Sequence, residues 1–227
     1  ARLDARVGAY ATVTADLARE QARRAEQAIT SGAAAGPSGE LPPLYGVPVP
    51  IKDLNLVKGV PTLFGSAVYE GFIAPLDDSV VERLRAAGTI MIGKTNAPEF
   101  GLPCYTETDV APPARTPWDP SRSAGGSSGG AAAAVAAGLA PAAHGSDGAG
   151  SIRIPASVCG LVGIKPSRGR VSGGPIAPDL AGLATSGPIA RDVADAAALL
   201  DAMAHSMPGD LSYAPPPELP FAEYARR

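Results

Sequence analysis

Cysteine is nearly absent from this chain of 227 residues, which contains only Cys104 and Cys159. The two lie far apart and form no C-x-x-C pair, so the sequence predicts neither a disulfide framework nor a structural zinc site. Histidine is equally scarce, with His144 and His205 alone, and the scattered carboxylates supply no cluster of metal ligands. We therefore expect no bound metal and two buried free thiols.

Strong net charge and long apolar runs are also missing. The net charge of −3 gives no reason to expect nucleic acid or an acidic membrane surface as a direct partner. No apolar run approaches the ~18 residues needed to cross a bilayer. The longest run of small residues, 131–143, is interrupted by Gly138 and Pro141. We expect a globular protein of the cytoplasm.

Short apolar runs alternate with helical patterns along the chain, which predicts an α/β fold with a largely buried sheet. Breaker-free or amphipathic stretches predict helices at 14–30, 77–88, 131–139, 152–159 and 192–203, and a helical turn at 96–100. Extended or unbroken apolar stretches predict strands at 46–51, 89–93 and 162–164.

Two glycine-serine loops, Gly125–Gly130 and Gly145–Ser151, flank the alanine-rich helix in the middle of the chain. Glycine lets the backbone turn through positive φ and bring its N–H groups close to a ligand. Serine hydroxyls relay protons or attack carbonyl groups, so Ser127, Ser128 and Ser151 are candidates for catalysis. The same serines could equally be N-caps of the helices that follow them.

Lys52 closes the first predicted strand, a position where α/β folds often carry functional groups. A lysine removed from water loses part of its preference for the charged form and can then act as a general base. The alternative is an ordinary strand-end lysine that reaches solvent.

Residues 126–130 also fit G-x-S-x-G, the nucleophile elbow of α/β-hydrolases. That motif needs a strand directly upstream, where we expect a loop at 119–123, and a histidine base that only His144 or His205 could provide. A Ser-His-Asp site is therefore poorly supported. Neither loop has the spacing of a nucleotide-binding motif, so phosphate or small-molecule binding without catalysis is the weaker alternative.

Several motifs, taken in order, resemble the amidase signature family. The central run contains GGSSGG, GSDGAGSIRIPA and CGLVGIKPS, and the upstream motifs are GVPVPIKD, GKTNAPEFG and PWDPSR. The similarity extends from about residue 1 to residue 206. It implies a large, mostly buried mixed sheet flanked by helices. The chain would be a single partial domain, with a catalytic core at 46–206 and a proline-rich linker into a truncated helix at 207–227.

The resemblance implies an amidohydrolase with a Ser–cis-Ser–Lys triad and an acyl-enzyme intermediate, needing no metal or organic cofactor. Matched motif by motif, Ser151 would be the nucleophile, Ser127 the bridging serine in a cis peptide bond, and Lys52 the base. Backbone N–H groups around the nucleophile would form the oxyanion hole, and nearby polar side chains would support the triad. These are Gly148, Ala149, Gly150 and Ser151 for the hole, and Ser128, Asp147 and Arg153 for support.

The chain departs from the family pattern at three places and in its length. Ala149 stands where a glycine is common, Ser146 where a threonine is common, and Leu63-Phe64 where small hydroxylated residues are frequent, which suggests a more apolar entrance. Family members run about twice as long, so the C-terminal half is expected to be missing here. The implied partners are a small-molecule amide and either a second copy or that missing half. The alternative function is the glutamine-amidase component of a transamidation complex.

Overall fold

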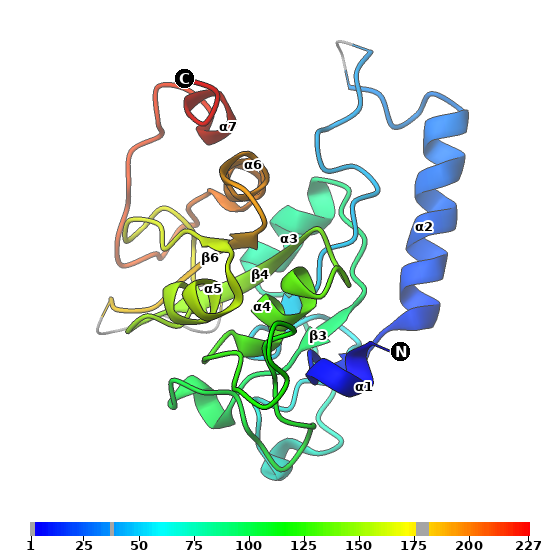
Figure 1. The fold of residues 1–227 in the computed structure, drawn as a ribbon. Helices are drawn as coiled ribbons and strands as arrows, with labels where there is room; N and C mark the ends of the chain where they lie inside the picture. Colours follow the sequence, from blue (N-terminus) through cyan, green and yellow to red (C-terminus); the bar gives the residue numbers. More distant parts are fainter. Residues whose placement is uncertain (1–2, 37–38, 176–181) are drawn as a thin grey trace.

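The computed structural model describes residues 3–36, 39–175 and 182–227, in which helices and strands alternate as an α/β fold (Figure 1). The strands are β1 (Tyr10–Val13), β2 (Ile51–Lys52), β3 (Gly93–Thr95), β4 (Ala142–Asp147), β5 (Val162–Gly163) and β6 (Thr185–Ala190). The α-helices are α1 (Asp4–Val7), α2 (Ala15–Thr30), α3 (Ser79–Ala86), α4 (Gly129–Ala136), α5 (Arg153–Cys159), α6 (Val193–Met203) and α7 (Phe221–Tyr224). Two 3-10 helices are η1 (Ala67–Tyr69) and η2 (Glu99–Gly101).

The described strands form two three-stranded sheets. The first has the order β1-β3-β2, with β3 antiparallel to β1 and parallel to β2. The second has the order β4-β6-β5 and is antiparallel throughout. The α/β fold with mixed β structure is thus confirmed, with its strands divided between two sheets rather than joined in one continuous ladder.

The two sheets meet where β2 lies beside β4, a junction that we call the seam. The backbone N–H of His144 donates to the carbonyl of Pro50 at 3.1 Å. The backbone N–H of Lys52 donates to Nδ1 of the His144 ring at 3.3 Å. Because β2 ends at Lys52 and β4 leads through Asp147 into the second glycine loop, the seam brings two candidate segments together.

Helix α4 lies in the middle of the molecule and carries no side chain larger than valine (Figure 1). Residues 131–135 are fully buried, and the helix contacts five strands, drawn from both sheets, besides α1 and α5. Alanine is the best helix former and leaves room for close approach of neighbouring backbones. At Gly130 even one methyl group would collide with the main chains of Asn96 and Ala9. The small residues of α4 therefore let both sheets pack around one helix.

Most helix predictions are confirmed, at α2, α3, α5 and α6, to within two residues at each end. Helix α4 begins at Gly129, two residues before the prediction, and the turn predicted at 96–100 is η2 instead. The strand predicted at 89–93 is wrong in position, because Ile90 makes only an isolated bridge to Pro48 and the strand proper is β3. Strands β1 and β6 were not predicted, since β1 is only four residues long and Gly187 and Pro188 interrupt β6.

The periphery of the molecule holds the least buried elements. Helix α2 has no buried residue and stands on the outer side of the fold, and α7 packs against α6 (Figure 1). Within the described residues, no helix combines the length and the apolar character required to span a membrane. Cys159 is buried as expected, but Cys104 is exposed, because it lies in the long surface connection before α4.

Candidate active site

Lys52 is fully buried at the end of β2, and its amine has three oxygen partners. Nζ forms hydrogen bonds with Ser127 Oγ at 2.8 Å, Ser146 Oγ at 3.1 Å and the Ser146 carbonyl at 3.3 Å. A neutral amine has two N–H donors and one lone pair, so it can satisfy these partners by donating to Ser146 and accepting from Ser127. The strand-end lysine that reaches solvent is therefore excluded.

Burial lowers the pKa of Lys52 to about 7, and the negative charge of Asp147 limits this decrease. The cause is the loss of water around an ammonium ion, which favours the neutral form. An amine with this pKa is deprotonated to a large extent near neutral pH, as a general base must be.

Ser127 follows a cis peptide bond from Gly126, as the resemblance implies, and its side chain is buried. The segment around η2 lies directly over it, because a Cβ added at Gly101 would be 3.2 Å from Ser127 Oγ. A Cβ added at Gly126 would be 2.7 Å from the backbone nitrogen of Tyr105. Glycine at both positions allows this close packing around the hydroxyl.

Ser128 is buried at the start of α4 and joins the two glycine-serine loops. Its Oγ donates to the Ser146 carbonyl at 3.2 Å and accepts from the Ser146 N–H at 3.3 Å. Its backbone N–H donates to the carbonyl of Ser151 at 3.1 Å. Ser128 therefore fixes both the lysine's partner Ser146 and the loop that carries Ser151, and its side chain is not used as a helix cap.

Asp147 organises the second loop through its buried carboxylate. Oδ1 accepts from the Gly150 N–H at 2.7 Å and Oδ2 from the Ile152 N–H at 3.1 Å. Arg153 forms a two-pronged ion pair with the same carboxylate, at 2.9 and 3.0 Å. Burial by itself would raise the pKa of Asp147, but the bonds from Arg153 and the backbone outweigh it and hold the pKa well below its usual range. Asp147 and Arg153, two of the residues expected to support the triad, therefore pair with each other.

Ser151 is partly exposed at the end of this loop, one residue before Ile152, the N-cap of α5. Its Oγ makes no hydrogen bond within the described part of the chain and is free to meet a ligand. The N–H groups of Ala149 and Ser151 likewise find no partner among the residues described. The Gly150 N–H does not fit the expected oxyanion hole in this geometry, because Asp147 already accepts it.

A second buried lysine, Lys94 on β3, was not recognised as part of this region from the sequence. Its Nζ pairs with Asp53 Oδ1 at 2.8 Å and donates to Thr62 Oγ1 at 2.9 Å, with both charged side chains at most 1% exposed. The other oxygen of Asp53 accepts from the Leu63 N–H at 3.0 Å. Asp53 thus holds Lys94, not Lys52, which leaves the Lys52 amine without a directly bonded carboxylate. The sequence does contain a signal for this residue, because Lys94 stands in a strand whose neighbouring residues are apolar or small.

The histidines do not support a Ser-His-Asp site. His144 is fully buried and its ring binds the Lys52 N–H and, through Nε2, Ser186 Oγ at 3.0 Å. His205 binds the carbonyl of Met203 through Nδ1. No strand of the described chain directly precedes Ser127, so the nucleophile elbow of α/β-hydrolases is also excluded.

Aromatic residues cluster beside the segment that covers Ser127. The Phe64 and Tyr69 rings lie 4.8 Å apart, Tyr69 and Phe72 5.8 Å, and Tyr69 and Phe100 6.2 Å. Phe100 directly precedes Gly101 and is 50% exposed. The cluster includes Phe64, one of the two residues from which an apolar entrance is expected.

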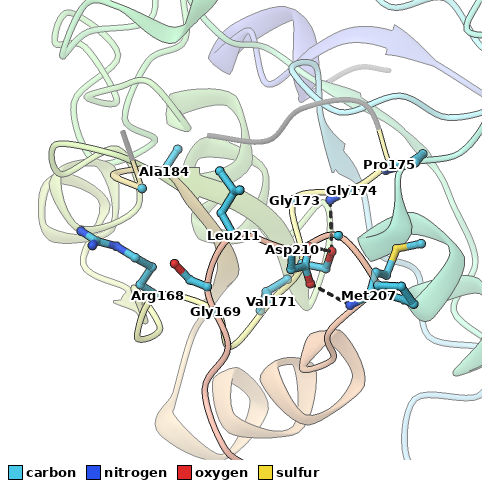
Figure 2. A pocket seen from close by; sticks show the side chains of 15 residues that line it. Arg168, Gly169, Val171, Gly173, Gly174, Pro175, Ala184, Met207, Asp210 and Leu211 are labelled. Carbon is cyan, nitrogen blue, oxygen red and sulfur yellow. Dashed lines mark hydrogen bonds between the residues drawn. The ribbon is translucent and has the colours of Figure 1, made fainter. Parts of the chain in front are cut away.

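A pocket of about 240 Å³ lies elsewhere, between residues 168–175 and 207–212 (Figure 2). Asp210 spans it, accepting from Ser172 Oγ and from the Met207 N–H, each at 2.7 Å. None of Lys52, Ser127 and Ser151 lines this pocket, and its one carboxylate is engaged in these bonds. We therefore place the candidate active site at the seam and not in this pocket.

Comparisons with known proteins identify the family to which the sequence is similar. The sequence matches the family described as Amidase over residues 1–226. It is 47% identical to a glutamyl-tRNA(Gln) amidotransferase subunit of Thermobifida fusca, over 100% of this chain and 44% of that protein. It is also 47% identical to 6-aminohexanoate-cyclic-dimer hydrolase of Paenarthrobacter ureafaciens, over 90% of this chain and 40% of that protein.

Among solved structures, 6-aminohexanoate cyclic dimer hydrolase complexed with substrate superposes with a TM-score of 0.87 and 41% identity. The match covers 97% of this chain and 44% of that one. The chain therefore spans less than half the length of the relatives that it matches.

Proposed function

The chain belongs to the amidase signature family, and from this membership we propose that the full-length protein is an amidohydrolase using Lys52, Ser127 and Ser151. The observation that carries the proposal is the hydrogen bond of 2.8 Å between the buried amine of Lys52 and Oγ of Ser127, beside the loop that contains Ser151. A desolvated amine with a pKa of about 7, a relay hydroxyl and a free hydroxyl are the groups that acyl transfer requires.

In the proposed reaction, neutral Lys52 takes the proton of Ser127 while Ser127 takes the proton of Ser151. Ser151 Oγ then bonds to the amide carbon, and the carbonyl π electrons move onto oxygen, where the N–H groups of Ala149 and Ser151 stabilise them. The proton returns through Ser127 to the amide nitrogen, and the C–N bond breaks to release the amine. Water attacks the resulting acyl-enzyme by the same proton path and regenerates Ser151.

Covalent labelling of the full-length protein by a fluorophosphonate tests this proposal. We expect one adduct on Ser151, located by mass spectrometry, and loss of both the adduct and amide hydrolysis in Ser151→Ala. The control is Ser157→Ala, which removes an exposed serine from the adjoining helix α5. If the folded protein is not labelled, the proposal that Ser151 is a nucleophile is contradicted. A non-catalytic site that binds anions or small molecules would then be favoured.

A panel of linear and cyclic amides would define the substrate. One relative is named as a hydrolase of a cyclic dimer, and the aromatic cluster near Gly101 presents apolar surface close to Ser127. We therefore propose that amides with an apolar acyl portion are hydrolysed faster than small polar ones. Equal rates across the panel would count against the cluster as part of the entrance.

The glutamine-amidase component of a transamidation complex is the second candidate, favoured by the similarity to an amidotransferase subunit. In that case glutamine hydrolysis would be slow for the isolated protein and would increase when its partner proteins are added. Fast hydrolysis of simple amides by the isolated full-length protein would favour the first candidate.

A further inference from the structure

His144 occupies a position in the seam that the catalytic assignment leaves unexplained. Its side chain is fully buried, and its imidazole lies between β2 and β6 although it belongs to β4. A buried histidine with both ring nitrogens bonded is fixed in orientation. Its two partners are the main chain of Lys52 and the hydroxyl of Ser186.

The hydrogen bonds determine the protonation of this ring. The backbone N–H of Lys52 can only donate, so Nδ1 must accept with its lone pair, and the proton must lie on Nε2 and point to Ser186 Oγ. A second proton would remove the acceptor that holds Lys52. Burial lowers the pKa of His144 to about 3, with the charges of Lys52 and Lys94 acting in the same direction, so the ring stays neutral.

Among the described residues, few hydrogen bonds of the main chain cross the seam, and the imidazole adds one to them. Within the part of the chain that the structure describes, one backbone hydrogen bond, from the His144 N–H to the carbonyl of Pro50 just before β2, joins this segment to β4. In a regular sheet, the N–H of Lys52 would donate to a backbone carbonyl of the neighbouring strand. Here it donates to the imidazole of His144 instead. The Lys52 amine, in turn, must reach Ser127 and Ser146, and Ser146 lies on β4.

We propose that His144 is a positioning residue, which holds the main chain of Lys52 across the seam by accepting its N–H on a neutral imidazole. This inference rests on the proposed role of Lys52 as the base. The ring fixes where the β2 strand ends, and therefore where the amine lies relative to the two serines. Errors of about 1 Å in such a placement lower rates by about 100-fold.

Three variants of the full-length protein test the inference. His144→Leu fills the space but removes the acceptor, whereas His144→Asn retains an amide oxygen close to the place of Nδ1. His205→Asn is the matched control, since His205 is the other histidine of the chain and its ring binds the Met203 carbonyl. Rates and their pH dependence are measured with the best amide, and main-chain protection is measured by hydrogen-deuterium exchange of the peptide that contains Lys52.

For His144→Leu we expect kcat to fall about 100-fold with little change in KM, and faster exchange at Lys52. The acidic limb of its pH profile should move to higher pH, because a loosened strand admits water to the amine and raises its pKa. His144→Asn should recover most of the rate, the profile and the protection, and His205→Asn should behave as the wild type.

The inference is overturned if His144→Leu keeps the kcat and pH profile of the wild type, even when exchange increases, because His144 would then serve stability alone. It is also overturned if His144→Asn is as impaired as His144→Leu. The loss of rate would then come from the changed size and shape of the side chain and not from the lost hydrogen-bond acceptor. Should His144→Leu fail to fold, Ser186→Ala replaces it. A fall in kcat at unchanged KM supports the inference, and unchanged kcat refutes it.

Failure of the proposed function gives a different result. If Lys52→Ala retains normal turnover, Lys52 is not the base, whatever the His144 variants do. Hydrogen exchange at Lys52 then still decides whether the imidazole holds the strand.

Discussion

At the scale of single residues, the two buried lysines Lys52 and Lys94 differ in their partners, although burial lowers the pKa of both. Lys94 has a carboxylate partner in Asp53 at 2.8 Å, while Lys52 has only hydroxyl and carbonyl oxygens within hydrogen-bonding distance. An adjacent carboxylate favours the charged ammonium, and its absence in a buried place favours the neutral amine. This difference supports the proposal that Lys52, rather than Lys94, is the base.

The pH dependence of kcat/KM follows from the state of Lys52. Only the neutral amine accepts a proton, and the pKa of Lys52 is about 7. Activity should therefore increase as the pH is raised through about 7, and it should be lost at lower pH, where the amine is protonated. Steady-state rates of the full-length protein across the neutral range measure this limb. Lys52→Ala should lower the rate by orders of magnitude and abolish the limb. An acidic limb near the ordinary pKa of a carboxylate would contradict the assignment.

Ser127→Ala tests the relay separately from the nucleophile. It removes the hydroxyl that, in the proposed relay, passes the proton of Ser151 to Lys52, but it leaves Ser151 in place, so we expect a large loss of kcat with little change in KM. A rate equal to that of the wild type would show that Lys52 reaches Ser151 without Ser127. Circular dichroism of the variant provides the control for folding.

At the scale of elements, the sequence predicts what is local and misses what is distant. The two glycine-serine loops, α4 and the end of β2 are readable because each is a continuous stretch with its own spacing. The pairing of Lys94 with Asp53 joins positions 41 apart, and the bond from Lys52 to His144 joins positions 92 apart. Such contacts depend on strand order, which the residue pattern leaves undetermined. Strand β3 was misplaced for the same reason, since its central residue is a buried lysine whose partners, Asp53 and Thr62, lie far away in the sequence.

The buried ion pair between β3 and the end of β2 should be costly to break on one side. Lys94→Met leaves the carboxylate of Asp53 buried without its cation, for which a loss of about 3–5 kcal/mol in the free energy of unfolding is typical. The double variant Asp53→Asn with Lys94→Met removes both charges and should lose less. Denaturant unfolding measures both, with Arg19→Ala as the control, because the Arg19–Asp16 pair is exposed.

An equal or greater loss in the double variant would contradict the interpretation, since it would show that the packing of the side chains matters more than the unpaired charge.

Packing at the start of α4 gives a second prediction at this scale. Gly130→Ala should destabilise the protein by about 1–3 kcal/mol, because the added methyl group meets two backbone segments that cannot move independently. Gly36→Ala is the matched control, since the nearest atom to its added Cβ, the Glu40 carbonyl oxygen, is at an ordinary 3.7 Å. Similar stability of the two variants would contradict the close packing described here.

At the scale of the whole molecule, α4 and the seam connect two sheets that share no continuous ladder. Because the central helix touches strands of both sheets, we expect the sheets to unfold together. The single tryptophan, Trp118, reports on the connection before α4, since its Nε1 donates to the Cys159 carbonyl at the end of α5 at 2.7 Å. Its fluorescence and the far-ultraviolet circular dichroism should change at the same denaturant concentration. Two separated transitions would mean that the sheets are independent units.

The small side chains of α4 also restrict how this sequence can diverge. Protein interiors tolerate exchanges that conserve total volume far better than those that add to it. A larger residue at any of positions 131–135 would need a compensating reduction on a facing element, and Ala143 and Ile189 belong to the same buried cluster as these alanines. Substitutions in the helix and in β4 or β6 should therefore occur in pairs among descendants of this chain, while the exposed face of α2 changes freely.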